Sequence, residues 1–84
     1  MPVTVTLVGR DGCHLCDDAR AIVVDVLSRH DGVVFNDVSI DEDEDFADRF
    51  REEIPVVLID GQVHNFWRID SDRLDQALTE REAV

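Results

Sequence analysis

The chain has 84 residues, 44% of them hydrophobic, which suits one small domain with its own core and leaves no room for a second. Twenty acidic residues against eight basic ones give a formal net charge of −12 at pH 7. The sequence has no lysine, so it excludes Schiff-base and P-loop lysine chemistry. The negative field repels polyphosphates and anionic lipids, so neither nucleic acid nor a membrane surface is an expected partner.

Hydropathy along the chain predicts a cytoplasmic protein. No apolar run approaches the roughly 20 residues that cross a bilayer. The segment before Gly9 is shorter than a signal peptide. We therefore expect a single domain over residues 1–84 in a reducing compartment.

The first third of the chain predicts a strand, a loop and a helix. Residues 3–8 alternate β-branched and apolar side chains and stop at Gly9, which is typical of a strand. Residues 9–12 contain two glycines and an aspartate and are expected to form a loop. From Leu15 onward apolar residues recur at helical spacing, which predicts an amphipathic helix of about four turns. We expect it to end near Gly32.

A second strand and a short helix follow. Residues 33–40 predict the strand, although their alternation is imperfect. The acidic run of residues 41–45 leads into Phe46, Ala47 and Phe50, which share one helix face. Carboxylates in a first helical turn are favourable beside the dipole, and no calcium-loop spacing follows, so a solvated helix start is favoured over a cation site.

The next segment predicts a hairpin. Residues 55–59 form a continuous apolar run typical of a buried strand, in which proline is tolerated at the first position. Asp60 and Gly61 are a strong hairpin signal. The return strand, residues 62–66, is less apolar and is expected nearer an edge of the sheet.

Asp70 or Ser71 can cap a last helix, whose apolar residues recur from Leu74 to Leu78. We expect the residues from about Thr79 to fray. The element order is then β-α-β-α-β-β-α. The first β-α-β unit requires a parallel, right-handed crossover, and the hairpin requires an antiparallel pair. Both conditions predict an α/β fold with one mixed four-stranded sheet and helices on both faces.

Cys13 and Cys16 form a Cys-x-x-Cys motif where the first strand gives way to the first helix. Two cysteines are too few for a secreted disulfide scaffold, and this spacing in a reducing compartment favours redox or metal chemistry. Within a helix, Cβ atoms three residues apart are about 5–6 Å apart, whereas a disulfide needs about 3.8 Å. A cysteine just before the first turn can close that gap.

The helix start also favours a thiolate, because free N–H groups and the helix dipole stabilise negative charge there. Arg10 adds to this effect, whereas Asp17 and Asp18 oppose it. We predict that Cys13 is the nucleophile and the more accessible thiol, and that Cys16 is the resolving thiol that releases a mixed disulfide.

These features together resemble a known family. Cys13-His14-Leu15-Cys16 after the first strand, Ile54-Pro55 before the third and Asp60-Gly61 in the hairpin are similar to the thioredoxin-like fold and, within it, to the small glutaredoxin-like proteins. The resemblance runs from about Val3 to Leu78. It implies a cis peptide bond at Pro55, facing the reactive cysteine, where the adjacent Ile54 backbone pairs with a bound peptide or thiol. Arg10 matches the basic residue that precedes the motif in that family.

The chain departs from glutathione-dependent members of that family. His14 and Leu15 replace the usual Pro-Tyr, and residues 64–70 contain no match to the Gly-Gly turn and Asp that help hold glutathione. A −12 protein also attracts this anion poorly. We expect a monomeric thiol–disulfide oxidoreductase with no built-in cofactor that acts on disulfide-containing protein clients. Glutathione or a thioredoxin-type reductase is the expected reductant, with thioredoxin-like partners or basic clients preferred over glutathione.

Two alternatives stay open. One is a metal or iron–sulfur binding module that uses the two thiolates, and the other is a redox-inert interaction domain on the same fold. The three histidines lack zinc-finger spacing, so no metal site is expected. His14 either tunes the thiols or is solvent-exposed. Phe66 and Trp67 are expected to pack in the core or on the surface rather than to border a substrate groove.

Overall fold

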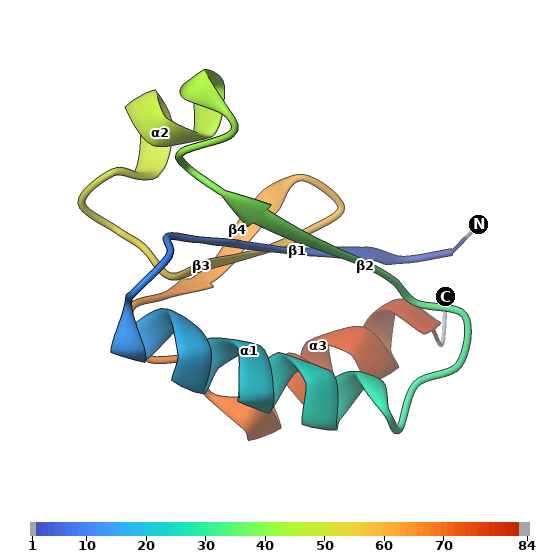
Figure 1. The fold of residues 1–84 in the computed structure, drawn as a ribbon. Helices are drawn as coiled ribbons and strands as arrows, with labels where there is room; N and C mark the ends of the chain where they lie inside the picture. Colours follow the sequence, from blue (N-terminus) through green and yellow to red (C-terminus); the bar gives the residue numbers. More distant parts are fainter. Residues whose placement is uncertain (1, 83–84) are drawn as a thin grey trace.

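The computed structural model describes residues 2–82. Its elements are, in chain order, β1 (Thr4–Gly9), α1 (His14–Leu27), β2 (Val34–Ser39), α2 (Glu44–Phe50), β3 (Val56–Ile59), β4 (Gln62–Phe66) and α3 (Ser71–Glu82) (Figure 1). The strands are ordered β2-β1-β3-β4, with β1 parallel to β2 and antiparallel to β3, and β3 antiparallel to β4. The predicted mixed four-stranded sheet is confirmed. No helix within residues 2–82 is long and apolar enough to span a membrane.

Successive residues of the central strands are buried on opposite faces of the sheet. In β1, Leu7 packs with residues of α1 and α3, whereas Val8 packs with residues of α2. All four residues of β3 are buried, because this strand lies between β1 and β4 and is covered on both faces. Figure 1 shows α1 and α3 on one side of the sheet and α2 on the other. The expected two-sided cover of helices is therefore confirmed.

The Asp60–Gly61 turn joins β3 to β4 as predicted. Asp60 has a φ of 50° and Gly61 a φ of 84°, the pair of positive values that a type I′ turn requires. The Asp60 carboxylate accepts a hydrogen bond from the Thr4 N–H at 2.9 Å and pairs with Arg81 at 2.9 Å. The turn therefore ties the start of β1 and the end of α3 to the sheet.

The first helix ends earlier than predicted. Regular α-helix stops at Leu27, and the N–H groups of Arg29 and His30 then donate to carbonyls three residues back, at 3.0 and 3.1 Å. The chain leaves this tightened turn through Gly32, which has a φ of 80°. Apolar periodicity does not distinguish a helix from such a turn, so the predicted end near Gly32 was too late in the chain.

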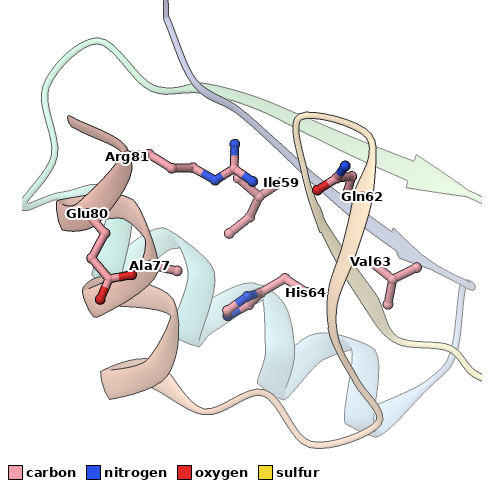
Figure 2. A pocket seen from close by; sticks show the side chains of 7 residues that line it. All are labelled: Ile59, Gln62, Val63, His64, Ala77, Glu80 and Arg81. Carbon is pink, nitrogen blue, oxygen red and sulfur yellow. The ribbon is translucent and has the colours of Figure 1, made fainter. Parts of the chain in front are cut away.

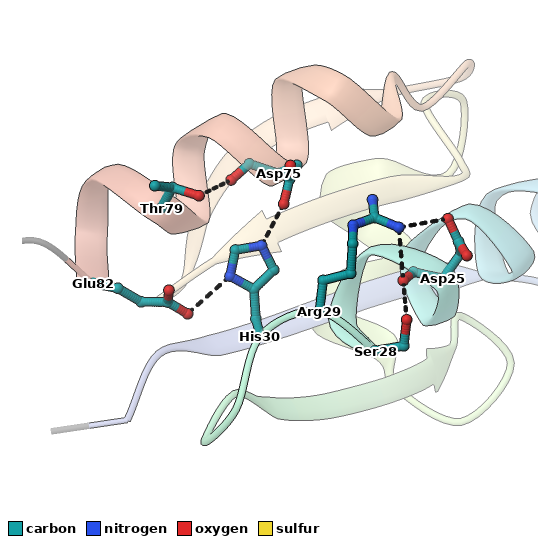
Figure 3. Close-up of polar contacts among 7 residues, drawn as sticks. All are labelled: Asp25, Ser28, Arg29, His30, Asp75, Thr79 and Glu82. Atoms are coloured by element: carbon teal, nitrogen blue, oxygen red, sulfur yellow. Dashed lines mark hydrogen bonds and ion pairs between the residues drawn. The ribbon is translucent and has the colours of Figure 1, made fainter.

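The last helix continues where fraying was predicted from Thr79. His30 lies between two carboxylates of α3, with Nε2 at 2.5 Å from Asp75 and Nδ1 at 2.9 Å from Glu82 (Figure 3). The His30 side chain is only 5% exposed. The prediction was wrong because these contacts join residues about 50 positions apart in the sequence, which helical periodicity does not register.

Candidate functional site

Cys13 is the N-cap residue of α1. Its backbone is extended, with φ −98° and ψ 116°, and its Sγ accepts a hydrogen bond from the Cys16 N–H at 3.2 Å. The sulfur therefore takes the place of the Ser, Thr or Asp oxygen that usually satisfies this N–H. Donation by an N–H and the positive end of the helix both favour negative charge on the sulfur. The partly exposed Cys13 is thus placed where the sequence predicted a nucleophile.

Cys16 lies one turn further along α1 and is completely buried. Burial raises the pKa of its thiol to about 11; a hydrogen bond with Cys13 adds to this rise and a backbone hydrogen bond with Arg10 opposes it. Both cysteines are free thiols. At neutral pH the buried Cys16 therefore keeps its proton, and the predicted order of exposure, Cys13 above Cys16, is confirmed.

Gly9 allows the end of β1 to approach α1. A Cβ atom built on Gly9 would lie 3.2 Å from both Cβ and Sγ of Cys16, closer than neighbouring atoms normally pack. The sequence marked this glycine only as the start of a loop. Its position shows that the absence of a side chain brings the strand and the cysteine pair together.

The Ile54–Pro55 peptide bond is cis, as the family resemblance implied. Val56 pairs with Val8 across the antiparallel β1–β3 ladder, so the register continued by one residue sets Pro55 opposite Gly9. Since Gly9 lies against Cys16, the proline is at the same end of the sheet as the cysteine pair. The role of Ile54 and Pro55 in binding a client stays a prediction.

Arg10 directly follows Gly9, the residue opposite that proline. It lines a small polar pocket of about 160 Å³ towards β2, together with Arg20 and Asp37, which pair at 2.6 Å. Neither Ile54 nor Pro55 lines this pocket. The Arg10 charge acts on Cys16 and lowers its pKa slightly against the larger effect of burial. The role of Arg10 in binding a substrate stays a prediction.

An apolar groove opens beside Leu15, the residue that lies between the two cysteines in the sequence. It has a volume of about 600 Å³ and is lined by Leu15, Ile54, Phe66, Trp67 and Arg68. Trp67 is 53% and Phe66 42% exposed, and the two rings pack edge-on, which agrees with the expected packing in the core or on the surface. Whether they border a substrate groove stays a prediction. Arg68 was not predicted at all. A tryptophan directly after a weakly apolar edge strand was the available signal for this groove.

A second hollow lies at the other end of β3, between β4 and α3. Its volume is about 410 Å³, and Figure 2 shows the His64 ring between the strand and the helix. The His64 Nε2 is buried and has no hydrogen-bond partner among the described residues. Burial lowers the pKa of His64, and the charges of Arg73 and Arg81 lower it further.

No metal-binding cluster occurs in the described part of the chain. Within residues 2–82, no three His, Cys, Asp or Glu side chains are grouped to hold a metal ion. His14, between the cysteines, is exposed.

The sequence matches the family model described as Glutaredoxin-like domain (DUF836) over residues 4–79. The chain is similar to the glutaredoxin-like protein YDR286C homolog of Dictyostelium discoideum, with 26% identity over 77 residues that cover 86% of this chain and 71% of that protein.

Solved structures show the same fold. The protein XcR50 from X. campestris is 32% identical, with a TM-score of 0.66 over 90% of this chain and 96% of that one. The oxidised mitochondrial thioredoxin 3 of Saccharomyces cerevisiae is 18% identical, with a TM-score of 0.70 over 93% of this chain and 77% of that one.

Proposed function

The chain belongs to the Glutaredoxin-like domain family, and from this premise we propose that it is a thiol–disulfide oxidoreductase that uses Cys13 and Cys16. The observation that carries the proposal is the difference in exposure and hydrogen bonding between the two sulfurs. Cys13 is partly exposed and accepts an N–H at the helix start, whereas Cys16 is buried and protonated beside it. An accessible sulfur at the helix start suits the nucleophile, and a neighbouring thiol within reach of it suits the resolving role.

The reaction has two balanced steps. The Cys13 thiolate attacks one sulfur of a client disulfide, which forms a mixed disulfide and expels the first client thiolate. Cys16 then gives up its proton and attacks the Cys13 sulfur, which forms the intramolecular disulfide and expels the second client thiolate. Two electrons pass to the client. Glutathione or a thioredoxin-type reductase returns them.

The pKa of Cys16 makes its proton the main obstacle in the second step. The groups that act on the Cys16 thiol are Cys13 and Arg10, and neither is a carboxylate or an imidazole. The departing client thiolate is the base that the first step itself produces. We therefore propose that it receives the Cys16 proton, directly or through water.

The test is the reaction of the reduced protein with hydroxyethyl disulfide, a small uncharged substrate. We expect the wild type to lose two thiols per chain and release two mercaptoethanols. Cys16→Ser should stop at a mixed disulfide on Cys13, seen as a mass increase, and Cys13→Ser should react far more slowly than either. If Cys13→Ser reacts as fast as Cys16→Ser, the assigned roles are wrong.

The reduction potential of the pair, with reduction rates by glutathione and by a thioredoxin reductase system, identifies the electron donor. We propose a potential towards thioredoxin's value of about −270 mV, below the roughly −200 to −230 mV of glutaredoxins. Rapid reduction by glutathione at physiological salt, together with a potential in the glutaredoxin range, would contradict this.

A further inference from the structure

Trp67 is fixed in a backbone conformation that few bulky residues adopt. Its φ is 64°, in the left-handed region, which costs energy unless the surrounding structure holds it. The Trp67 N–H donates to the Pro55 carbonyl at 2.8 Å, and its indole N–H donates to the Glu52 carbonyl at 3.1 Å. The Phe66 ring meets the indole edge-on, with centroids 5.0 Å apart. The indole is therefore held in one orientation.

This fixed indole is half exposed and divides a continuous apolar surface. On one side is the groove of about 600 Å³ described above, and on the other is a hollow of about 400 Å³ that extends along α1. Leu15, Trp67 and Arg68 line both, so we name the two together the Trp67 trough. The second hollow is lined by Leu15, Asp18, Ala19, Ile22, Trp67, Arg68 and Ile69.

The trough starts at the reactive motif. Leu15 lies between Cys13 and Cys16 in sequence and is 46% exposed, so one wall of the trough belongs to the same helical turn as the cysteine pair. The opposite wall is Trp67, whose backbone is tied to Pro55. A chain whose disulfide reaches Cys13 therefore lays its neighbouring side chains on this surface.

The charges of the trough favour an apolar side chain over an anion. Among residues 2–82, Asp18 and Arg68 are the only charged residues that line it, and their charges cancel, although the whole chain carries −12. A single arginine offers little to a small anionic thiol in this negative field. Burying apolar area against the indole stabilises a complex, and the net charge attracts a basic partner.

Building on the proposed function, we propose that Trp67 is a specificity residue that selects one class of client. The client is an extended, basic polypeptide segment with a large apolar side chain next to its disulfide cysteine. That side chain lies against the indole in the Trp67 trough while Cys13 attacks the disulfide. Trp67 positions the client and takes no part in the chemistry.

The experiment measures mixed-disulfide formation by the Cys16→Ser protein, which isolates the first step. The probes are the symmetric disulfides of two short Lys-flanked peptides that differ only in having Leu or Ala after the cysteine, with hydroxyethyl disulfide as a third substrate. We expect the Leu peptide to react about tenfold faster than the Ala peptide. In the Trp67→Ala background the ratio should fall below about threefold, and reaction with hydroxyethyl disulfide is measured alongside to show that the Cys13 thiol is still reactive.

Two further variants make the result specific. Leu15→Ala removes the opposite wall without touching the strained backbone and should also lower the ratio, which keeps the test valid if Trp67→Ala does not fold. Val63→Ala removes an apolar residue of β4 that is 45% exposed and outside the trough, and it should leave the ratio at about tenfold.

The possible failures are distinguishable. A ratio near one in the Cys16→Ser protein, or an unchanged ratio in both Trp67→Ala and Leu15→Ala, overturns the role of Trp67 while reaction with hydroxyethyl disulfide upholds the proposed function. No reaction with any of the three disulfides overturns both.

Discussion

His30 links the turn after α1 to α3, and its replacement by Gln tests how that link depends on pH. Its two ring nitrogens each contact a carboxylate, Asp75 at 2.5 Å and Glu82 at 2.9 Å (Figure 3). Both nitrogens donate a proton only in the imidazolium form. The hydrogen bond to Asp75, followed by that to Glu82, accordingly raises the pKa of His30.

The sign of the effect follows from linkage. A histidine in the unfolded chain titrates near about 6.5. Because the folded pKa is higher, the added stability is fully present below about pH 6.5 and is lost as the pH rises through the folded pKa. The two carboxylates are 41% and 39% exposed, so each pair contributes the roughly 0.2–1 kcal/mol of a partly exposed ion pair. The two pairs together contribute about 0.4–2 kcal/mol.

Urea unfolding under reducing conditions at pH 6.0 and pH 9.0 measures the difference. We expect His30→Gln to lower the free energy of unfolding by about 0.4–2 kcal/mol more at pH 6.0 than at pH 9.0. Arg29→Gln is the matched control, because Arg29 pairs with Asp25 at 3.0 Å in the same turn and does not titrate in this range. An equal loss for His30→Gln at both pH values, or a larger loss at pH 9.0, would refute the reasoning.

Four other outcomes are expected. His64 has a lowered pKa, so the folded state holds it neutral while the unfolded chain binds a proton, and the free energy of unfolding falls as the pH drops below about 6.5. His64→Gln should make this fall smaller in the same urea titration. Alkylation of the Cys16 thiol in Cys13→Ser should be very slow at pH 7 and accelerate into the alkaline range, since burial raises its pKa; fast alkylation at pH 7 contradicts the buried assignment. Leu78→Ala, at a completely buried position, should cost about 2–5 kcal/mol in thermal or urea unfolding, and a loss below 1 kcal/mol would show that the site collapses freely. Asp43→Ala removes the N-cap of α2 and should cost about 1 kcal/mol, whereas Asp43→Asn, which keeps an acceptor, should cost less.

The features that local sequence patterns control were predicted well. The strand–loop–helix around the cysteines follows from a change of periodicity at Gly9 and Gly12, and the β3–β4 hairpin follows from Asp60 and Gly61, whose positive φ values few other residue pairs supply. The cis bond at Pro55 came from the family resemblance, because only about 5–6% of X–Pro bonds in folded proteins are cis.

The features that were missed depend on contacts across the fold. The exposure of Trp67 depends on a hydrogen bond to Pro55, which is 12 residues earlier in the chain. The end of α3 depends on His30. No local pattern contains these pairings.

The N-cap position of Cys13 has a consequence for the helix itself. The sulfur that reacts is also the atom that satisfies the Cys16 N–H. In a disulfide this sulfur carries no charge and accepts a hydrogen bond more weakly, so oxidation loosens the first turn of α1 by up to the roughly 1 kcal/mol of an N-cap. That energy favours the reduced form and raises the reduction potential by up to about 20 mV, because 30 mV corresponds to about 1.4 kcal/mol. The Cys16 amide should therefore exchange its hydrogen with solvent faster in the oxidised protein, so that its exchange rate reports the redox state of the pair.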